Sequence, residues 1–357
     1  MRTQNFVLYG FGAIGKSIAD ILLDDGIHVA AILDQNKSGT SYRGVSILDL
    51  SKARSIQNIS EQTCLITLHN HYIDLKPIYE SLTAVGFKKI ESLVNSRKLH
   101  TGIHLKRGYW LAFDFPYTDH QHEIESAARS LNDEKSRRLL KEIWNYRQQG
   151  DIRTCPQPSR DDEYIPKDLQ KYKGPLKMID CGACTGQALE QIVNAGYELH
   201  SFVAFEPDAK NFELLRKKNY ASQKATYLPL GVWSTEAQLK FKGSGSTGSA
   251  LDEEGDTVIQ CVSLDHIIQG FHPNLIKLDV EGAEIEAMRG MEQIIREDRP
   301  NLCISIYHEP SHLYELPLLV QSWNLGYQLA IRVHEYNTFG VVLYCLNPNR
   351  IQVRPTN

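Results

Sequence analysis

Two acidic residues at the end of an apolar segment carry the sharpest chemical signal in the sequence, in the stretch Leu275-Ile-Lys-Leu-Asp279-Val-Glu281-Gly-Ala-Glu284. If the segment is a strand, Asp279 and Glu281 project from one face, because side chains alternate along a strand. At the carboxyl end of a parallel strand they can orient or deprotonate a hydroxyl group, or share a divalent ion. Alternatively, Glu281 and Glu284 only favour the N-terminus of the following helix. We assign no metal ligand from the sequence.

A glycine-rich turn follows another apolar strand, in the stretch Met178-Ile-Asp180-Cys-Gly182-Ala-Cys-Thr-Gly186. Glycine lets a bulky ligand lie against a strand tip, because no side chain is in the way and unusual backbone angles are allowed. Asp180 can stabilise a cationic ligand group, while Thr185 and the helix N-terminus approach a ligand carboxylate. The candidate ligand contacts in this turn are Asp180, Gly182, Ala183, Thr185 and Gly186.

The next two strands end in further candidate contacts. Glu206 and Pro207 follow the strand 200–205, and an acidic side chain there can accept hydrogen bonds from both ribose hydroxyls of a nucleoside. Nicotinamide dinucleotides use the same placement, and a solvated carboxylate that caps helix 208–218 is the alternative. Val232 and Trp233 close the third strand, where they can enclose adenine or belong to the core.

A histidine stands just beyond the fifth strand, in Ser305-Ile-Tyr-His308-Glu309. Imidazole titrates near neutral pH, so His308 is a candidate base for removing a proton from an acceptor hydroxyl. The competing interpretation is that it caps the helix that begins near Ser311.

A second glycine pattern lies near the N-terminus, in Gly10-Phe-Gly12-Ala-Ile-Gly15, between an expected strand and an expected helix. Asp34 ends the next strand, so the segment has the features of a dinucleotide site: Gly10, Gly12 and Gly15 approach a pyrophosphate and Asp34 holds a ribose. NAD(P) or another nucleotide is therefore a possible ligand. The unit is complete by about Arg97, however, which is short for the two halves that enclose a dinucleotide, so packing or substrate binding is the alternative.

These sites define the expected organisation. Residues 1–97 form a small Rossmann-like α/β domain, and residues 98–175 form a helical linker with one long helix over 123–149 and an irregular connection after it. Residues 176–357 form a second α/β domain, whose last two strands are joined by a turn too short for a crossover helix. The fold class is thus α/β: a mainly parallel seven-stranded sheet with an antiparallel C-terminal hairpin, preceded by the smaller domain. The expected strands of the second domain are 177–181, 200–205, 225–230, 274–280, 300–307, 326–333 and 339–346, and its expected helices are 187–195, 208–218, 264–269, 284–294 and 312–324.

Composition narrows the class of protein. The 357 residues include 39 Lys and Arg against 43 Asp and Glu, and no dense basic run is interleaved with aromatic residues, so nucleic acid is not an expected partner. Apolar runs are too short to span a membrane and the N-terminus enters a strand pattern, so we expect a soluble, cytoplasmic protein. The seven cysteines are scattered along the chain, so we expect reduced thiols and no disulfide framework. Cys181 and Cys184 form a C-x-x-C pair, but no second Cys or His pair follows at the spacing of a zinc site.

Taken in order, five motifs resemble the FkbM family of S-adenosylmethionine-dependent methyltransferases. They are Asp180-Cys-Gly-Ala-Cys-Thr-Gly186, Glu206-Pro207, Ser263-Leu-Asp265, Ile276-Lys-Leu-Asp-Val-Glu-Gly-Ala-Glu284 and Arg299-Pro300. The similarity covers about Tyr164 to Leu346, and the block that begins at Lys277 is its most specific part. Family members methylate hydroxyl oxygens of polyketides, sugars and related metabolites, so the resemblance implies S-adenosylmethionine as cofactor and O-methyl transfer. A departure is the stretch Gly243-Ser-Gly-Ser-Thr-Gly248, which is expected to be a mobile loop and leaves the acceptor side undefined.

Three hypotheses follow from these observations. The first is methyl transfer from S-adenosylmethionine to a hydroxyl of a small molecule, either a sugar or a secondary metabolite, with Asp279, Glu281 and His308 as catalytic residues. The second is an NAD-dependent sugar oxidoreductase or epimerase that uses the N-terminal glycine pattern. The third makes the N-terminal domain a non-catalytic module that binds a nucleotide-linked sugar or a partner protein. The oligomeric state is left open.

Overall fold

The computed structural model describes residues 5–103, 109–218, 224–243, 250–251 and 255–352. The chain divides into two compact units, and the division differs from the boundaries expected at 97 and 175. The first unit comprises residues 1–118, 141–157 and 335–339, and the second comprises 119–140, 158–334 and 340–357. The first unit extends beyond Arg97 because Ile103, Trp110 and Tyr146 bury their side chains in one of its cores.

The first unit is built on a six-stranded sheet in the order β3-β4-β2-β1-β5-β6. All of its pairings are parallel except that of β3 with β4. The small Rossmann-like domain expected from the sequence is thus present. Between the parallel strands β2 and β4, the short strand β3 takes the place of a crossover helix and pairs with β4 as a hairpin. The strands are β1 (Phe6–Tyr9), β2 (Val29–Leu33), β3 (Ser41–Tyr42), β4 (Val45–Leu48), β5 (Thr63–Ile66) and β6 (Lys89–Glu91).

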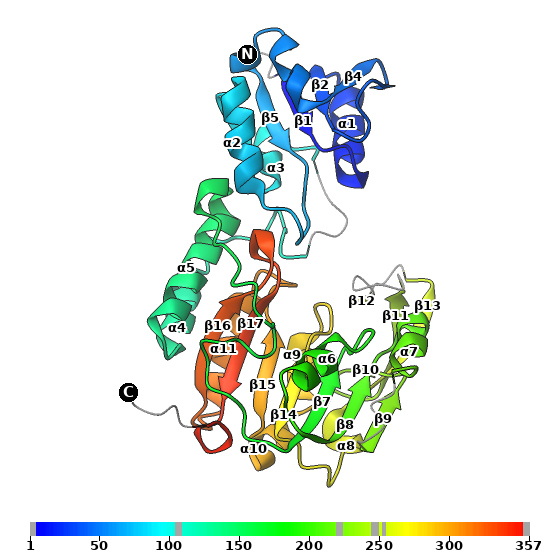
Figure 1. Cartoon of the computed structure of the whole chain (residues 1–357), viewed down its shortest axis with the longest axis vertical. Helices are drawn as coiled ribbons and strands as arrows, with labels where there is room; N and C mark the ends of the chain where they lie inside the picture. The colour runs from blue at the N-terminus through cyan, green and yellow to red at the C-terminus, as the bar shows by residue number, and fades with distance from the viewer. Residues whose placement is uncertain (1–4, 104–108, 219–223, 244–249, 252–254, 353–357) are drawn as a thin grey trace. The chain divides into compact units, whose positions relative to one another are not determined.

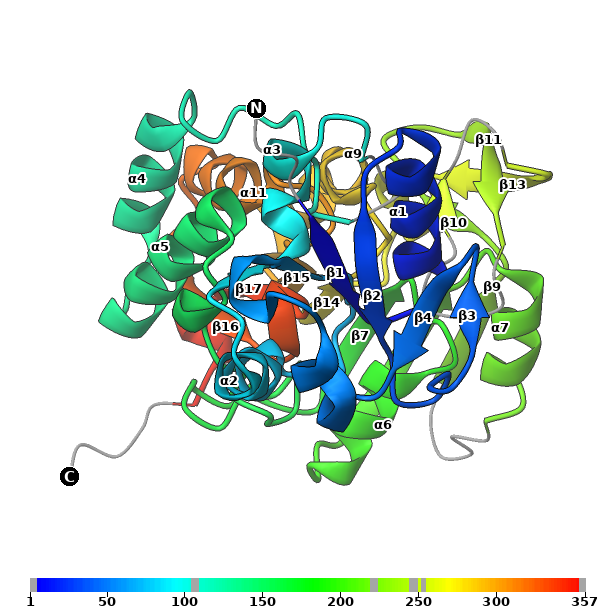
Figure 2. The same ribbon diagram turned by 90° about the horizontal axis from the view of Figure 1, so that it is seen from above.

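Helices cover both faces of this sheet, as Figure 2 shows from above. Alternate residues of β1 enter different cores: Phe6 and Leu8 pack with residues of α1 (Ala13–Asp24), whereas Val7 packs with residues of α2 (Leu75–Val85). The period of two along a strand explains why the run 6–9 is buried on both sides. The short helix α3 (Ser96–Leu99) follows β6.

The expected helix over 123–149 is two helices, α4 (Gln121–Ser130) and α5 (Glu134–Gln149). Leu131 adopts extended angles at the end of α4, and the Asp133 carboxylate accepts a hydrogen bond of 2.8 Å from the Ser136 amide. An Asp side chain that accepts from the amide three residues later is typical of a helix N-cap, so Asp133 begins a new helix. The apolar spacing runs on through this break, which is why the sequence predicted one helix. No helix in the described ranges is both long enough and apolar enough to cross a membrane.

The second unit contains a seven-stranded sheet in the order β16-β17-β15-β14-β7-β8-β9 (Figure 1). Its strands are parallel except for β17, which runs antiparallel to both of its neighbours. The predicted mainly parallel sheet with an antiparallel C-terminal hairpin is confirmed. The strands are β7 (Leu176–Cys181), β8 (Leu199–Phe205), β9 (Lys224–Leu228), β14 (Leu275–Leu278), β15 (Asn301–Ser305), β16 (Gln328–Val333) and β17 (Val341–Leu346).

The helices of this unit are close to those expected, with one break. The predicted helix 284–294 divides at Gly290, where a Cβ atom would lie 2.0 Å from the Trp233 carbonyl oxygen, so this close backbone approach requires glycine. The helices are α6 (Gln187–Asn194), α7 (Ala209–Leu215), α8 (Leu264–Ile267), α9 (Glu284–Arg289), α10 (Glu292–Asp298) and α11 (His312–Ser322).

A second sheet lies between β9 and β14 in the chain, and the sequence analysis did not predict it. It has four strands in the order β10-β13-β11-β12. Their bounds are β10 (Gly231–Val232), β11 (Ala237–Lys242), β12 (Ala250–Leu251) and β13 (Thr257–Val262). Residues 244–248 of the loop expected to be mobile lie outside the described residues.

The turn between β16 and β17, residues 335–339, is part of the first unit. The Asn337 side-chain amide donates a hydrogen bond of 2.8 Å to the Asn70 carbonyl oxygen. The buried guanidinium of Arg147 donates to the Thr338 carbonyl oxygen at 3.0 Å and to its hydroxyl oxygen at 3.1 Å. The hairpin tip is therefore anchored by side chains from distant parts of the sequence.

Replacing Gly15 by alanine should destabilise the protein, because the new Cβ atom would lie 2.1 Å from the Gly10 carbonyl oxygen. We expect the apparent free energy of unfolding to fall by about 3 kcal/mol or more. The matched control is Gly12→Ala, since nothing lies within 4 Å of a Cβ at Gly12, and its cost should be about 1 kcal/mol or less. Urea denaturation of the full chain followed by circular dichroism measures both, and equal losses would contradict the packing role of Gly15.

Candidate active site

The candidate residues of the second unit gather at the carboxyl ends of β7, β8, β14 and β15. In this sheet β7 pairs with β8 on one side and with β14 on the other, so the strand order reverses between β7 and β14. Ligands of open α/β sheets bind beside such a point of reversal. Asp180 lies in β7, Glu206 directly follows β8, and Asp279 directly follows β14.

Asp180 forms a buried ion pair with Lys277, a residue that the sequence analysis did not assign to the site. The Lys277 Nζ lies 3.1 Å from Asp180 Oδ1, and both side chains are almost completely buried. Burial raises the pKa of Asp180, and the lysine opposes this rise. Burial alone would lower the pKa of Lys277, but the carboxylates of Asp180 and Asp279 raise it above its ordinary value. The detectable signal was a lysine inside an apolar strand, since lysine is almost never fully buried unless it is paired.

The glycine turn packs directly against the end of β14. A Cβ atom on Gly182 would lie 1.9 Å from the Asp279 carbonyl oxygen, and Gly182 has a φ of +75°, so both the close approach and the backbone angle require glycine. Lys277 Nζ also donates a hydrogen bond to the Gly182 carbonyl oxygen. Gly186 precedes α6 with a φ of +93°, while Ala183 is buried and Thr185 half-buried. The turn is thereby fixed to the strand that carries the catalytic candidates.

Glu206 is buried and oriented by backbone amides. Its Oε2 accepts a hydrogen bond of 2.7 Å from the Cys184 amide, and its Oε1 accepts one of 2.9 Å from the Asp208 amide. Burial raises the pKa of Glu206, and the two amides oppose this rise. Asp208, not Glu206, caps α7, because its carboxylate accepts from the Lys210 amide. Glu206 thus connects its strand to the glycine turn, and the half-buried Pro207 separates the two acids.

Trp233 packs in an apolar cluster of the four-stranded sheet, against Phe241, Ile259 and Cys261. Val232 belongs to β10 and is buried. Of the two interpretations of Trp233, this contact set favours a core side chain.

His308 brings the catalytic candidates together. Its Nε2 lies 3.5 Å from Asp279 Oδ1 and 3.7 Å from Glu281 Oε2. The two carboxylates do not reach it by strand alternation, because β14 ends at Leu278 and Glu281 has a left-handed φ of +57°. The turn after the strand, rather than the strand itself, places the pair.

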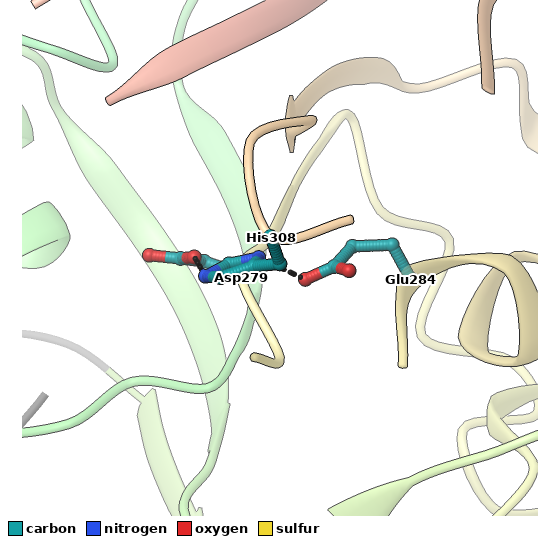
Figure 3. A group of neighbouring side chains, drawn as sticks. All are labelled: Asp279, Glu284 and His308. Atoms are coloured by element: carbon teal, nitrogen blue, oxygen red, sulfur yellow. Dashed lines mark ion pairs between the residues drawn. The ribbon is translucent and has the colours of Figure 1, made fainter. Parts of the chain in front are cut away.

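Glu284 lies at the centre of this group, whereas the sequence suggested only a role at a helix N-terminus. It is 0% exposed, its Oε1 lies 2.9 Å from His308 Nδ1, and its Oε2 lies 3.2 Å from His312 Nδ1. Figure 3 shows His308 between the carboxylates of Asp279 and Glu284. Oε1 also accepts a hydrogen bond of 3.0 Å from the Val280 amide.

The buried charges shift one another's pKa values. Burial alone would lower the pKa of His308, but the carboxylates of Glu284, Glu281 and Asp279 raise it to about 10. Burial raises the pKa of Glu281 to about 8, against the opposing effect of His308. Burial would also raise the pKa of Glu284, but the two histidines hold it well below its ordinary value. The cluster of His308, Glu281 and Glu284 can therefore hold and exchange a proton beside the Asp279 carboxylate, which is partly exposed at the strand end.

In the first unit the glycine pattern forms the expected turn between β1 and α1. The Asp34 carboxylate accepts hydrogen bonds from the Phe11 amide at 2.8 Å and from the Asn36 amide at 3.0 Å, so it joins the glycine turn to the end of β2. Gly15 is required by close packing against the Gly10 carbonyl oxygen, Gly10 by its φ of +98°, and nothing lies within 4 Å of a Cβ at Gly12. The oxidoreductase or epimerase hypothesis calls for a catalytic Tyr-x-x-x-Lys pair after the glycine pattern. Tyr72 and Lys76 have this spacing, but Tyr72 precedes α2 and does not share a helix with Lys76. Ribose or pyrophosphate binding here stays a prediction.

Three comparisons with known proteins agree with this geometry. Residues 180–329 match the family model described as the methyltransferase FkbM domain. The hexuronic acid methyltransferase AglP of Haloferax volcanii is 30% identical over 101 residues, which are 26% of this chain and 42% of that protein. The chain thus matches less than half of the length of that curated relative. The crystal structure of the methyltransferase FkbM from Methylobacillus flagellatus KT is similar in fold, with a TM-score of 0.77 and 20% identity over 96% of this chain and 90% of that one.

The chain thus has the α/β fold of that methyltransferase, with the predicted seven-stranded sheet and antiparallel C-terminal hairpin. Residues 180–329 match the methyltransferase FkbM domain, as the resemblance in the sequence had indicated. The family match does not include the glycine pattern Gly10–Gly15 of the first unit.

Replacing Lys277 by methionine should leave the Asp180 charge buried without its partner, and we expect a loss of about 3–5 kcal/mol in the free energy of unfolding. The double variant Lys277→Met/Asp180→Leu should recover much of that loss, because no charge is then left unpaired. The control is Arg216→Met, which breaks the exposed pair with Glu213 and should cost less than about 1 kcal/mol. Urea unfolding compares the three, and an unchanged stability of Lys277→Met would contradict the ion pair.

Proposed function

We propose that this protein transfers the methyl group of S-adenosylmethionine to a hydroxyl oxygen of a sugar-type small molecule. The observation that carries the proposal is the position of Glu206, the Gly182 turn, Asp279 and His308 at neighbouring strand ends beside the reversal of strand order. The match of residues 180–329 to the methyltransferase FkbM domain supports it.

The residues fit the cofactor by their donor chemistry and charge. A carboxylate has about four lone-pair sites, and Glu206 uses two of them for the Cys184 and Asp208 amides, so it can also accept from ribose hydroxyls. The half-buried carboxylates of Asp279 and Glu281 supply negative charge for a sulfonium. Asp180, neutralised by Lys277, supports the glycine turn and does not contact the cofactor's cationic end directly in this proposal.

When bound, S-adenosylmethionine supplies an activated methyl group and retains the electron pair of the broken carbon–sulfur bond on sulfur. The protein must align the acceptor oxygen with that methyl group and receive the hydroxyl proton. Asp279 is placed to accept a hydrogen bond from the acceptor, because it is the most exposed acid of the group. Glu281, whose burial raises its pKa to about 8, takes up the proton, and His308 holds both carboxylates in place.

The acceptor is proposed from the chemistry of the site and from the relative named above. The name of the Haloferax volcanii relative says that it methylates a hexuronic acid, and a sugar hydroxyl needs the proton acceptor that the carboxylates provide. We propose the cytoplasm as the setting of the reaction. A panel of neutral and uronic sugars, offered with labelled S-adenosylmethionine, identifies the acceptor by mass spectrometry.

Two substitutions should separate cofactor binding from chemistry. Glu206→Gln removes the charge from the ribose contact, and we expect the Kd for S-adenosylmethionine to rise by about 10- to 100-fold. Asp279→Asn should raise that Kd less than Glu206→Gln does, because Glu281 still offers a carboxylate near the sulfonium, but it should lower kcat by about 10²- to 10⁴-fold, the usual contribution of a residue in proton transfer. Isothermal titration gives the first quantity and the methylation assay gives the second.

The control is Glu213→Gln, an exposed acid on α7 that pairs with Arg216, which should change neither quantity. No binding of S-adenosylmethionine to the unaltered protein, or equal effects of Glu206→Gln and Glu213→Gln, would contradict the proposal.

A further inference from the structure

A buried polar atom beside His308, Asp279 Oδ1, makes no hydrogen bond with any residue in the described part of the chain. The neighbouring carboxylate of Glu284 is 0% exposed, so bulk water does not reach it, and its Oε2 lies 3.2 Å from His312 Nδ1. Buried polar groups of native proteins nearly always have a partner, and an ion is one of the few explanations when they do not.

The geometry of the group suits a single metal ion. Asp279, Glu284 and His308 each bring a possible ligand atom within 4.8 Å of the other two. Ligands held about 2.1 Å from one ion are separated by about 3.0 Å at right angles and by about 4.2 Å across it. Only one ring nitrogen of His308 can bind a given ion, and its Nε2 lies 3.5 Å from Asp279 Oδ1, between these two values. Small side-chain rotations therefore bring three ligand atoms to one centre.

The charges around the group point to a cation. Asp279, Glu281 and Glu284 contribute three carboxylates within contact distance of His308. The nearest lysine, Lys277, lies 3.1 Å from Asp180 and 3.9 Å from Asp279, so its charge is already opposed by Asp180. Several carboxylates share a buried site at low cost only when positive charge compensates them, and a protonated His308 offers one charge against three carboxylates. A divalent cation supplies that charge at one point.

We propose that Asp279, Glu284 and His308 bind a divalent first-row transition-metal ion. Two carboxylates and an imidazole suit Mn²⁺, Fe²⁺ or Zn²⁺ better than Mg²⁺ or Ca²⁺, which prefer oxygen ligands alone. His312 supports the site from outside by contacting the second oxygen of Glu284. Such outer contacts orient a ligand and strengthen metal binding.

The site has one accessible side. The Asp279 side chain is 21% exposed, whereas those of His308 and Glu284 are buried, so the open coordination positions lie on the Asp279 side. Three protein ligands leave room for an oxygen atom from an acceptor. This role rests on the proposed function: an acceptor hydroxyl beside the ion becomes more acidic, its proton passes to Glu281, and its oxygen forms the new bond to the methyl carbon while the carbon–sulfur bond breaks.

Titration of chelator-treated full-length protein with MnCl₂ alone, without S-adenosylmethionine, tests the proposal. We expect about one Mn²⁺ per chain, detected by isothermal titration and by the loss of the free-ion electron paramagnetic resonance signal. Asp279→Asn and His308→Gln should each raise the Kd for Mn²⁺ by more than about tenfold, and His312→Gln, which removes only the outer contact, by about 10-fold.

His266→Gln is the matched control, because His266 also contacts a carboxylate, that of Glu236, but does so on the exposed surface. Its Kd should equal that of the unaltered protein, and circular dichroism shows whether each variant is folded. No Mn²⁺ binding up to millimolar concentration, or equal weakening by His266→Gln and His308→Gln, overturns the proposal.

The two proposals fail independently. Binding of S-adenosylmethionine with no binding of Mn²⁺ rejects the metal site and leaves methyl transfer intact. Binding of Mn²⁺ by the unaltered protein but not by Asp279→Asn supports the metal site even if no acceptor is methylated.

Discussion

The buried contact between Lys277 and Asp180 is the constraint on which the site depends. A lysine in the middle of a sheet must be compensated, and here it neutralises Asp180 on the adjacent strand and donates to the Gly182 carbonyl oxygen. The same turn approaches the Asp279 backbone so closely that only glycine fits. One cation thus fixes the spacing between the turn proposed to receive the cofactor and the strand end that carries the acids. Positions set in this way do not need a ligand to form them.

Much of the second unit could be predicted because its signals are local. Apolar strands, glycine turns and acids at strand ends follow one another in an order that determines the sheet, and the sequence placed Asp279 and His308 after strands, where the structure has them. Glu284 and His312 were not predicted, because a buried acid between two histidines is a tertiary arrangement that no spacing along the chain reveals. The alternation argument for Glu281 was wrong in its reason, since a left-handed turn places that residue.

The first unit shows a different limit of sequence patterns. Its glycine pattern suggested a ligand, yet Gly15 is required by contact with the Gly10 carbonyl oxygen, and Asp34 is engaged by backbone amides. A glycine that permits a ligand and a glycine that permits packing are identical in a sequence. The boundary near Arg97 was also misplaced, because the apolar residues that complete the core come from segments far along the chain.

The hairpin tip has a consequence for how the chain matures. Residues 335–339 belong to the first unit, although they follow the matched segment 180–329 in the chain. During synthesis Asn70 and Arg147 leave the ribosome before Asn337 and Thr338 are made. The hydrogen bonds that join Asn337 to Asn70 and Arg147 to Thr338 can therefore form only later. Domains usually fold in the order in which they are made, but this unit can complete its hydrogen bonds only after residues 335–339 have been translated. The hydrogen bonds at the hairpin tip therefore form only after the segment that matches the methyltransferase domain has been synthesised.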